Sequence, residues 1–141
     1  MSITGVISDE IYCDAMREHL ARLEEEFTEI EALAAANQFT PLVYRATERN
    51  LQLLIEACIG TAKQAIKSKG QVVPSDARKA FELLRQQGED ASRLEWAKVI
   101  GMRNALVHDY LNIESARIMD VINGRFHHDL FAFARHLIGA G

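Results

Sequence analysis

The sequence has few of the features that mark secreted, membrane-bound or disulfide-held proteins. Its 141 residues include only two cysteines, Cys13 and Cys58. Both fall at apolar positions of predicted helices, so we expect reduced thiols in the core. No apolar run approaches the ~18 residues that a membrane span needs, and the first ten residues lack the basic and apolar regions of a signal peptide. We therefore predict a cytoplasmic protein without membrane association.

The sequence also lacks the period-two alternation of apolar and polar residues that is typical of strands. Apolar residues instead recur at spacings of three and four after a predicted helix start at Ser8-Asp9-Glu10. This heptad seam consists of Cys13, Met16, Leu20, Leu23, Phe27, Ile30 and Ala34. A seam of about three repeats needs a partner helix, either within the same chain or across a dimer.

Capping residues, prolines and glycines divide the rest of the chain into four further predicted helices. We expect these helices to begin at Thr40-Pro41, at Pro74-Ser75-Asp76, at Asp90 or Ser92, and at Asn112. The helix that begins at Asp90 or Ser92 would end near residues 108–110. Because the connections are short, the sequence predicts an all-α fold, an antiparallel bundle of four to five helices that forms a single domain over residues 1–141.

Charge is distributed unevenly along the chain, whose formal net charge is −4. Residues 1–40 contain two basic and nine acidic side chains, whereas residues 41–90 contain eight basic and six acidic ones. Residues 91–141 contain six basic and five acidic side chains. A polyanion is therefore expected to bind the C-terminal two thirds of the chain. The acidic first helix would then face solvent or a basic partner.

Residues 101–110, Gly-Met-Arg-Asn-Ala-Leu-Val-His-Asp-Tyr, concentrate groups that can do chemistry on a phosphate. The guanidinium of Arg103 is a permanently charged fork that suits a phosphate. A histidine titrates near neutrality, so His108 can take a proton from a ribose 2′-OH or give one to a departing 5′-oxygen. Asn104 can orient the phosphate or hold the histidine tautomer. This set would suffice for cleaving RNA without a metal ion or other cofactor.

Spacing alone does not establish such a site. On an unbroken helix Arg103 and His108 diverge by about 140°. For both to reach one substrate, the helix must end near His108 or two copies of the segment must face each other, which favours a cleft in a homodimer. Structural roles fit the same residues: Arg103 paired with Asp109, His108 at the helix C-terminus, and the ring of Tyr110 packed at the bundle edge.

The segment resembles the signature of the HepT family within the HEPN superfamily: arginine, four spacer residues, histidine, one spacer and tyrosine are all present. A second stretch, residues 45–57 (Arg-Ala-Thr-Glu-Arg-Asn-Leu-Gln-Leu-Leu-Ile-Glu-Ala), is similar to the block that the family carries on its second helix. Together with the order and lengths of the predicted helices, the resemblance covers about residues 8–138. It implies a HEPN-like domain that acts as a ribonuclease toxin.

By the family pattern, Arg103 and His108 would form the catalytic pair, with Asn104 supporting them, in a cleft between two protomers. The resemblance also implies a partner, a minimal nucleotidyltransferase antitoxin of the MntA kind. Tyr110 matches the tyrosine that this partner modifies with AMP from ATP. Each AMP would place a negative charge and an adenosine beside a site for an RNA phosphate. The resemblance thus implies a metal-independent endoribonuclease of a toxin–antitoxin pair, neutralised by AMPylation.

Two other functions fit the same sequence. HEPN-like domains also serve as non-catalytic binding subunits of nucleotidyltransferase complexes, and the net acidity suits a protein partner. The heptad seam would suit a structural dimerisation bundle. Growth arrest on expression of this chain alone, relieved by His108→Ala, would separate the toxin from both alternatives.

No metal site is expected from the sequence. The adjacent His127 and His128 point about 100° apart on a helix, and no Cys or His three or four residues away completes a ligand set. Aromatic residues are expected in the core rather than as stacking platforms for RNA bases. The residues concerned are Trp96, Phe126, Phe131 and Phe133.

Overall fold

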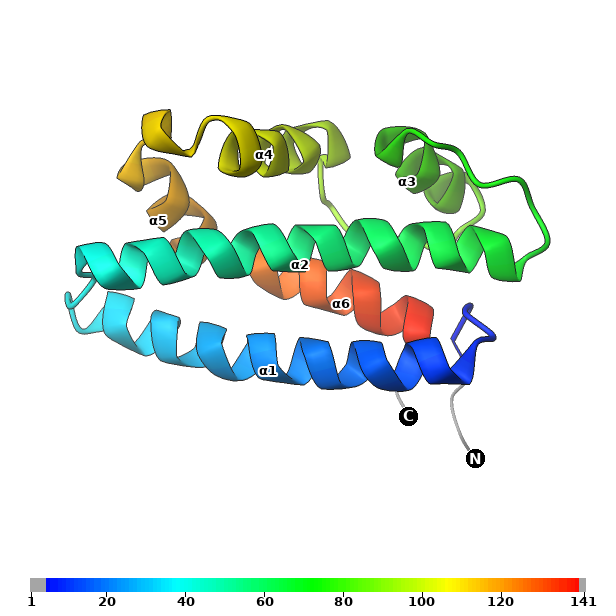
Figure 1. Cartoon of the computed structure of the whole chain (residues 1–141), viewed down its shortest axis with the longest axis horizontal. Coiled ribbons are helices and arrows are strands. Elements are labelled where there is room, and N and C mark those ends of the chain that lie inside the picture. The colour runs from blue at the N-terminus through cyan, green and yellow to red at the C-terminus, as the bar shows by residue number, and fades with distance from the viewer. Residues whose placement is uncertain (1–4, 140–141) are drawn as a thin grey trace.

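The computed structural model describes residues 5–139, and this part of the chain contains six α-helices and one 3-10 helix (Figure 1). They are α1 (Glu10–Ala35), α2 (Pro41–Ser68), α3 (Ala77–Gln86), α4 (Trp96–His108), η1 (Tyr110–Asn112), α5 (Ser115–Asn123) and α6 (Phe126–Ile138). No strand occurs among the described residues, which confirms the predicted all-α class. None of the helices described is both long and apolar enough to cross a membrane.

α2 is the central helix of the bundle and packs against α1, α3, α4, α5 and α6. In Figure 1, α1 runs antiparallel along one side of α2, and α3 and α4 follow each other along the opposite side. α6 lies behind α2 and contacts α1 as well. α2 therefore holds α4, the helix that carries the predicted catalytic residues, in the bundle.

The first two helices begin where the sequence predicts. The side chain of Asp9 accepts a hydrogen bond from the Tyr12 N–H (3.1 Å), and Thr40 accepts one from the Val43 N–H (3.3 Å). These bonds satisfy amide groups that a helix start leaves unpaired. The heptad seam of α1 faces α2 and α6, so its partner helices lie within the same chain.

The fourth helix begins later than predicted, at Trp96 instead of Asp90 or Ser92. The Asp90 carboxylate is used within the preceding loop: Oδ1 accepts a hydrogen bond from the Ser92 N–H (2.9 Å) and Oδ2 one from the Trp96 indole (2.7 Å). Arg85 forms an ion pair with the same Oδ2 (2.7 Å). Asp90 thus stabilises the loop before α4 and does not cap the helix.

The single fifth helix of the prediction is two helices, α5 and α6, so the described residues form six α-helices rather than four to five. Asn112 does not cap a helix but ends η1. The break falls at Gly124 and Arg125, where Arg125 adopts a left-handed conformation (φ 57°). A Cβ at Gly124 would lie 2.6 Å from the Phe126 ring and 2.9 Å from the carbonyl oxygen of Asp120, so this close turn requires glycine.

An aromatic cluster fixes the start of α4 in the core. The Trp96 ring stacks on Phe81 with centroids 3.7 Å apart, and Phe133 packs edge-on against both rings.

Cys13 and Cys58 are buried and free, as predicted. Phe131 is also buried, but Phe126 is 52% exposed, which corrects its assignment to the core.

Candidate functional site

α4 carries the predicted catalytic residues on and beside its outer surface. Its inner stripe of Trp96, Met102 and Leu106 is buried. Arg103 is half-buried next to this stripe, whereas Asn104 and His108 are exposed. Burial of the apolar stripe thus sets which way the polar residues point.

The helix is continuous from Trp96 to His108, and the N–H of Asp109 closes it on the Ala105 carbonyl (2.8 Å). Arg103 and His108 therefore remain about 140° apart around the helix axis. Asn104 precedes His108 by four residues and shares its face. A single chain brings Asn104 and His108 together but leaves Arg103 on a different side of α4.

The structural roles that fitted these residues are only partly observed. Asp109 is not paired with Arg103 among the described residues; it accepts a hydrogen bond from Asn112 Nδ2 (2.5 Å). Nε of Arg103 is buried without a hydrogen-bond partner in the described structure. The backbone of Tyr110 opens η1, and its side chain lies outside the described residues. Within the described part, Arg103 is thus a cation without a carboxylate partner.

The start of α2 lies beside the segment that follows the motif. The Tyr44 hydroxyl donates a hydrogen bond to the carbonyl of Ile113 (3.2 Å). One turn further along α2, Oε2 of Glu48 is buried without a partner in the described structure. Burial raises the pKa of the Glu48 carboxyl, although Arg45 opposes the shift. Glu48 belongs to the 45–57 block that resembles the family, but periodicity offered no reason to select it.

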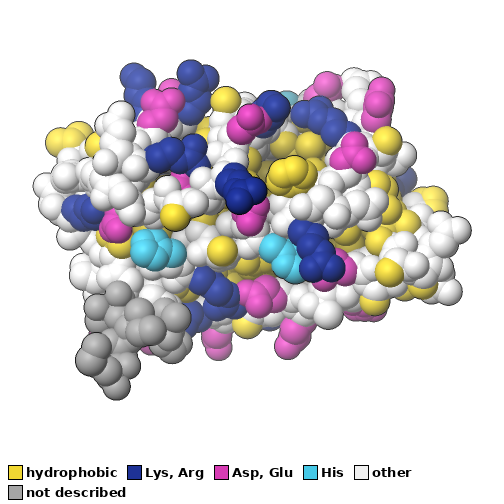
Figure 2. Space-filling model, turned by 180° about the vertical axis from the view of Figure 1, so that it is seen from behind, with side chains coloured by type: hydrophobic (Ala, Val, Ile, Leu, Met, Phe, Trp, Pro, Cys, Tyr) yellow, Lys and Arg dark blue, Asp and Glu magenta, His cyan; other side chains and the backbone are white. Residues whose placement is uncertain are grey.

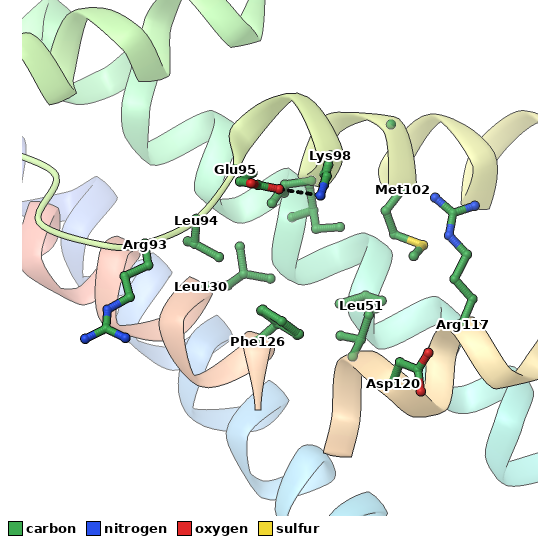
Figure 3. A pocket seen from close by; sticks show the side chains of 14 residues that line it. Leu51, Arg93, Leu94, Glu95, Lys98, Met102, Arg117, Asp120, Phe126 and Leu130 are labelled. Carbon is green, nitrogen blue, oxygen red and sulfur yellow. Dashed lines mark ion pairs between the residues drawn. The ribbon is translucent and has the colours of Figure 1, made fainter. Parts of the chain in front are cut away.

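A groove of about 860 Å³ opens between α4, α5 and α6 on the face shown in Figure 2. Figure 3 shows apolar side chains such as Leu51, Leu130 and Phe126 in the groove together with charged ones, and Arg117 of α5 extends toward α4 beside Met102. Lys98 at the rim pairs with Glu95 (2.6 Å). Because the walls are mainly apolar, the groove suits a phosphate poorly, and the candidate site remains the outer surface of α4.

The family follows from the comparison of the sequence with known protein families. The described residues form an all-helical domain in which Arg103, Asn104 and His108 lie on α4. Residues 16–137 match the model of the family described as "Ribonuclease HepT-like". The chain belongs to this HepT-like family, which confirms the resemblance identified from the motif.

Individual relatives agree with this family. The chain is 32% identical to the mRNA nuclease HepT of Shewanella oneidensis over 75 residues, which cover 52% of this chain and 56% of that protein. The match thus spans about half the length of that curated relative. A solved structure described as "Crystal structure of the toxin-antitoxin with AMP-PNP" superposes with a TM-score of 0.72, covering 88% of this chain and 98% of that chain. At 23% identity this likeness shows the shared fold.

Proposed function

We propose that this chain is a metal-independent endoribonuclease, the toxin of a toxin–antitoxin pair. The observation that carries the proposal is the intact motif of a HepT-like chain at the exposed end of α4. His108 is accessible to substrate, and Arg103 has no carboxylate partner among the described residues. The curated relative from Shewanella oneidensis is an mRNA nuclease, which supports RNA as the substrate class.

The chemistry needs one proton acceptor, one proton donor and a stabilised phosphorane. The His108 imidazole takes the proton of a ribose 2′-OH as the 2′-oxygen attacks the adjacent phosphorus. The bond from phosphorus to the 5′-oxygen breaks, and an imidazolium returns a proton to that oxygen. Arg103 stabilises the negative charge that grows on the phosphorane oxygens. The products are a 2′,3′-cyclic phosphate and a 5′-OH.

The divergence of Arg103 and His108 supports a homodimer, with each site drawing on two chains. The exposure of two apolar side chains near His108 also fits this assembly. Val107 and Leu111, on either side of His108, are 38% and 83% exposed. An apolar surface beside a polar site is typical of a surface that another protein covers.

Cleavage of RNA by the purified full chain in excess EDTA tests the proposed reaction. We expect activity in EDTA, with a loss of about 10²–10⁴-fold in His108→Ala because the general acid and base are removed. Arg103→Ala should lose a comparable factor, since a charge on the transition state is left uncompensated. His136→Ala is the matched control, because His136 is an exposed histidine on α6, and it should cleave like the unchanged chain. A strict requirement for magnesium, or full activity in His108→Ala, would contradict the proposal.

The proposed partner is a nucleotidyltransferase antitoxin of the MntA kind, which transfers AMP from ATP to the Tyr110 hydroxyl oxygen and releases pyrophosphate. The structural neighbour was crystallised as a toxin–antitoxin with AMP-PNP, an ATP analogue, which supports a nucleotide-using partner. An AMP on Tyr110 would add a negative charge two residues from His108. That charge would repel the phosphate of an incoming RNA.

Mass spectrometry of the chain co-expressed with such a partner tests this regulation. We expect one or more AMP additions on the peptide that contains Tyr110, and none in Tyr110→Phe. The other tyrosines, Tyr12 and Tyr44, provide internal controls. An unmodified Tyr110 in a fully neutralised complex would show inhibition by binding alone.

Expression of the chain by itself separates the toxin from a non-catalytic HEPN binding subunit. Both share the fold and both would bind a nucleotidyltransferase. The toxin is expected to arrest growth, and His108→Ala is expected to relieve the arrest. Arrest that persists in His108→Ala, or no arrest by the unchanged chain, would favour the binding subunit.

A further inference from the structure

Three side chains with metal-binding atoms meet where the end of α1 packs against the start of α6. Oε1 of Glu31 lies 2.7 Å from Nε2 of His127, and Nε2 of His128 contacts the same oxygen. One ligand atom from each residue lies within 4.8 Å of the other two. Neither helix could supply this set alone, because the carboxylate and the imidazoles are 96 and 97 residues apart in sequence.

The three residues differ in burial, which gives the cluster a fixed side and an open side. The His127 side chain is only 1% exposed, and its ring stacks on Phe27 with centroids 4.9 Å apart. His128 is 49% exposed and Glu31 is 33% exposed. Packing therefore fixes the His127 ring with Nε2 directed at Glu31, while an ion from solvent can enter beside His128.

In either neutral tautomer of His127, one ring nitrogen has a lone pair that faces no hydrogen-bond donor. A neutral imidazole carries a single N–H. If Nε2 carries it toward Glu31, Nδ1 is a buried lone pair, and Nδ1 has no hydrogen-bond partner in the described structure. If Nδ1 carries it, toward the nearby Val121 carbonyl, Nε2 directs its lone pair at a carboxylate oxygen. Two acceptors at 2.7 Å need a proton or a metal ion between them.

We propose that Glu31, His127 and His128 bind a Zn²⁺ ion that links α1 to α6. Two imidazole nitrogens and one carboxylate oxygen are a ligand set that zinc prefers, whereas magnesium and calcium prefer oxygen ligands alone. Tetrahedral zinc would hold the ligand atoms about 3.3 Å apart. The Glu31 carboxylate and the His128 ring lie partly at the surface, so they can move until the ligand atoms reach this separation. A water molecule fills the fourth position.

Burial lowers the pKa of His127, and the hydrogen bond to Glu31 opposes that shift. Burial alone would raise the pKa of Glu31, but hydrogen bonds from His128 and His127 lower it overall. A Glu31 carboxylate would supply the negative charge that attracts the ion. The sequence argument against a metal considered only neighbours within one helix, and the third ligand comes from α1.

Titration of the tag-free, EDTA-stripped full chain with ZnCl₂ in a calorimeter tests the site. We expect one Zn²⁺ per chain. His128→Ala and Glu31→Gln should each weaken binding at least about tenfold, because three ligands fall to two. Both positions are at least one third exposed, so both variants should fold. His136→Ala, which removes an exposed histidine of the same helix, should bind like the unchanged chain.

Thermal unfolding with and without zinc provides the second measurement. Zinc should raise the Tm of the unchanged chain more than that of His128→Ala at the same zinc concentration, because a weaker site stabilises the folded state less. Absence of zinc binding by the unchanged chain, or equal binding by Glu31→Gln, would overturn the proposal. So would equal losses in His136→Ala. RNA cleavage in EDTA does not depend on this outcome, since no proposed ligand lies on α4.

Discussion

At the scale of single residues, Asp90 holds the loop that leads into the motif helix. Its carboxylate is 1% exposed and interacts with Arg85, Ser92 and Trp96. Burial alone would raise its pKa, but the hydrogen bonds from Ser92 and Trp96 and the charge of Arg85 hold the pKa of Asp90 below its usual range. The ionised form is therefore a structural element of the loop.

We expect Asp90→Asn to lower the free energy of unfolding by about 2–3 kcal/mol, measured in urea at neutral pH. An amide keeps only one acceptor oxygen, so either Ser92 or Trp96 loses its bond. Asp14→Asn is the control, because Asp14 is 77% exposed in its pair with Arg17, and should cost less than about 1 kcal/mol. Equal effects of the two substitutions would refute the assigned role.

The same carboxylate predicts a pH dependence with a definite sign. Its pKa is lower in the folded than in the unfolded state, so its contribution is present above the unfolded pKa of about 3.9. That contribution is lost as pH falls through the lower, folded pKa. The difference in stability between the unchanged chain and Asp90→Asn should therefore shrink in acid.

Functional residues can be predicted from the sequence only when the residues of one site lie close together along the chain. Arg103, Asn104 and His108 lie within six consecutive residues, so a motif can identify them. The Glu31 cluster depends on a tertiary contact between α1 and α6, and no spacing within one helix could reveal it.

At the scale of helices, the turn between α5 and α6 is the element that sequence periodicity missed. Apolar residues continue across residues 112–138 with helical spacing, so a single helix was the natural prediction. Only Gly124 interrupts the pattern, and an isolated glycine is tolerated within helices. Its close contacts with Phe126 and Asp120, which make the glycine necessary, exist only in the folded chain.

Two glycine substitutions should therefore have opposite effects on stability. Gly124→Ala introduces a Cβ too close to a backbone carbonyl and is expected to cost about 1–3 kcal/mol. Gly101→Ala, in α4, places its Cβ where no atom lies within 4 Å. It should stabilise the helix by about 0.5–1 kcal/mol. Urea unfolding of both variants checks the prediction, and stabilisation by Gly124→Ala would contradict the contact geometry.

Helix starts were predictable where a capping side chain acts on its own helix. Thr40 and Asp9 cap as expected, because that interaction involves residues only three apart. Asp90 has the same type of side chain, but its partners include Arg85 and the Trp96 indole. Competition from these contacts moved the start of α4 to Trp96, and local sequence does not contain that information.

At the scale of the whole molecule, the divergence of Arg103 and His108 leads to a test of the proposed homodimer. If each site takes Arg103 from one chain and His108 from another, mixtures of Arg103→Ala and His108→Ala should regain activity. Random pairing of equal amounts leaves one intact site in half of the dimers, or about a quarter of full activity. The measurement is RNA cleavage after the two variants are unfolded and refolded together. No recovery in mixed dimers confirmed by mass would place both residues in one chain.

The central position of α2 has a consequence for how the chain folds during synthesis. α2 packs against α6, which begins at Phe126 and so follows the end of α2 by more than 50 residues. The part of α2 that faces α6 therefore stays uncovered on a nascent chain until α6 has left the ribosome. At synthesis rates of roughly 5–20 residues per second, that interval lasts several seconds. During this time Trp96 lacks its contact with Phe133 of α6, so the packing at the start of α4 is completed only after α6 emerges.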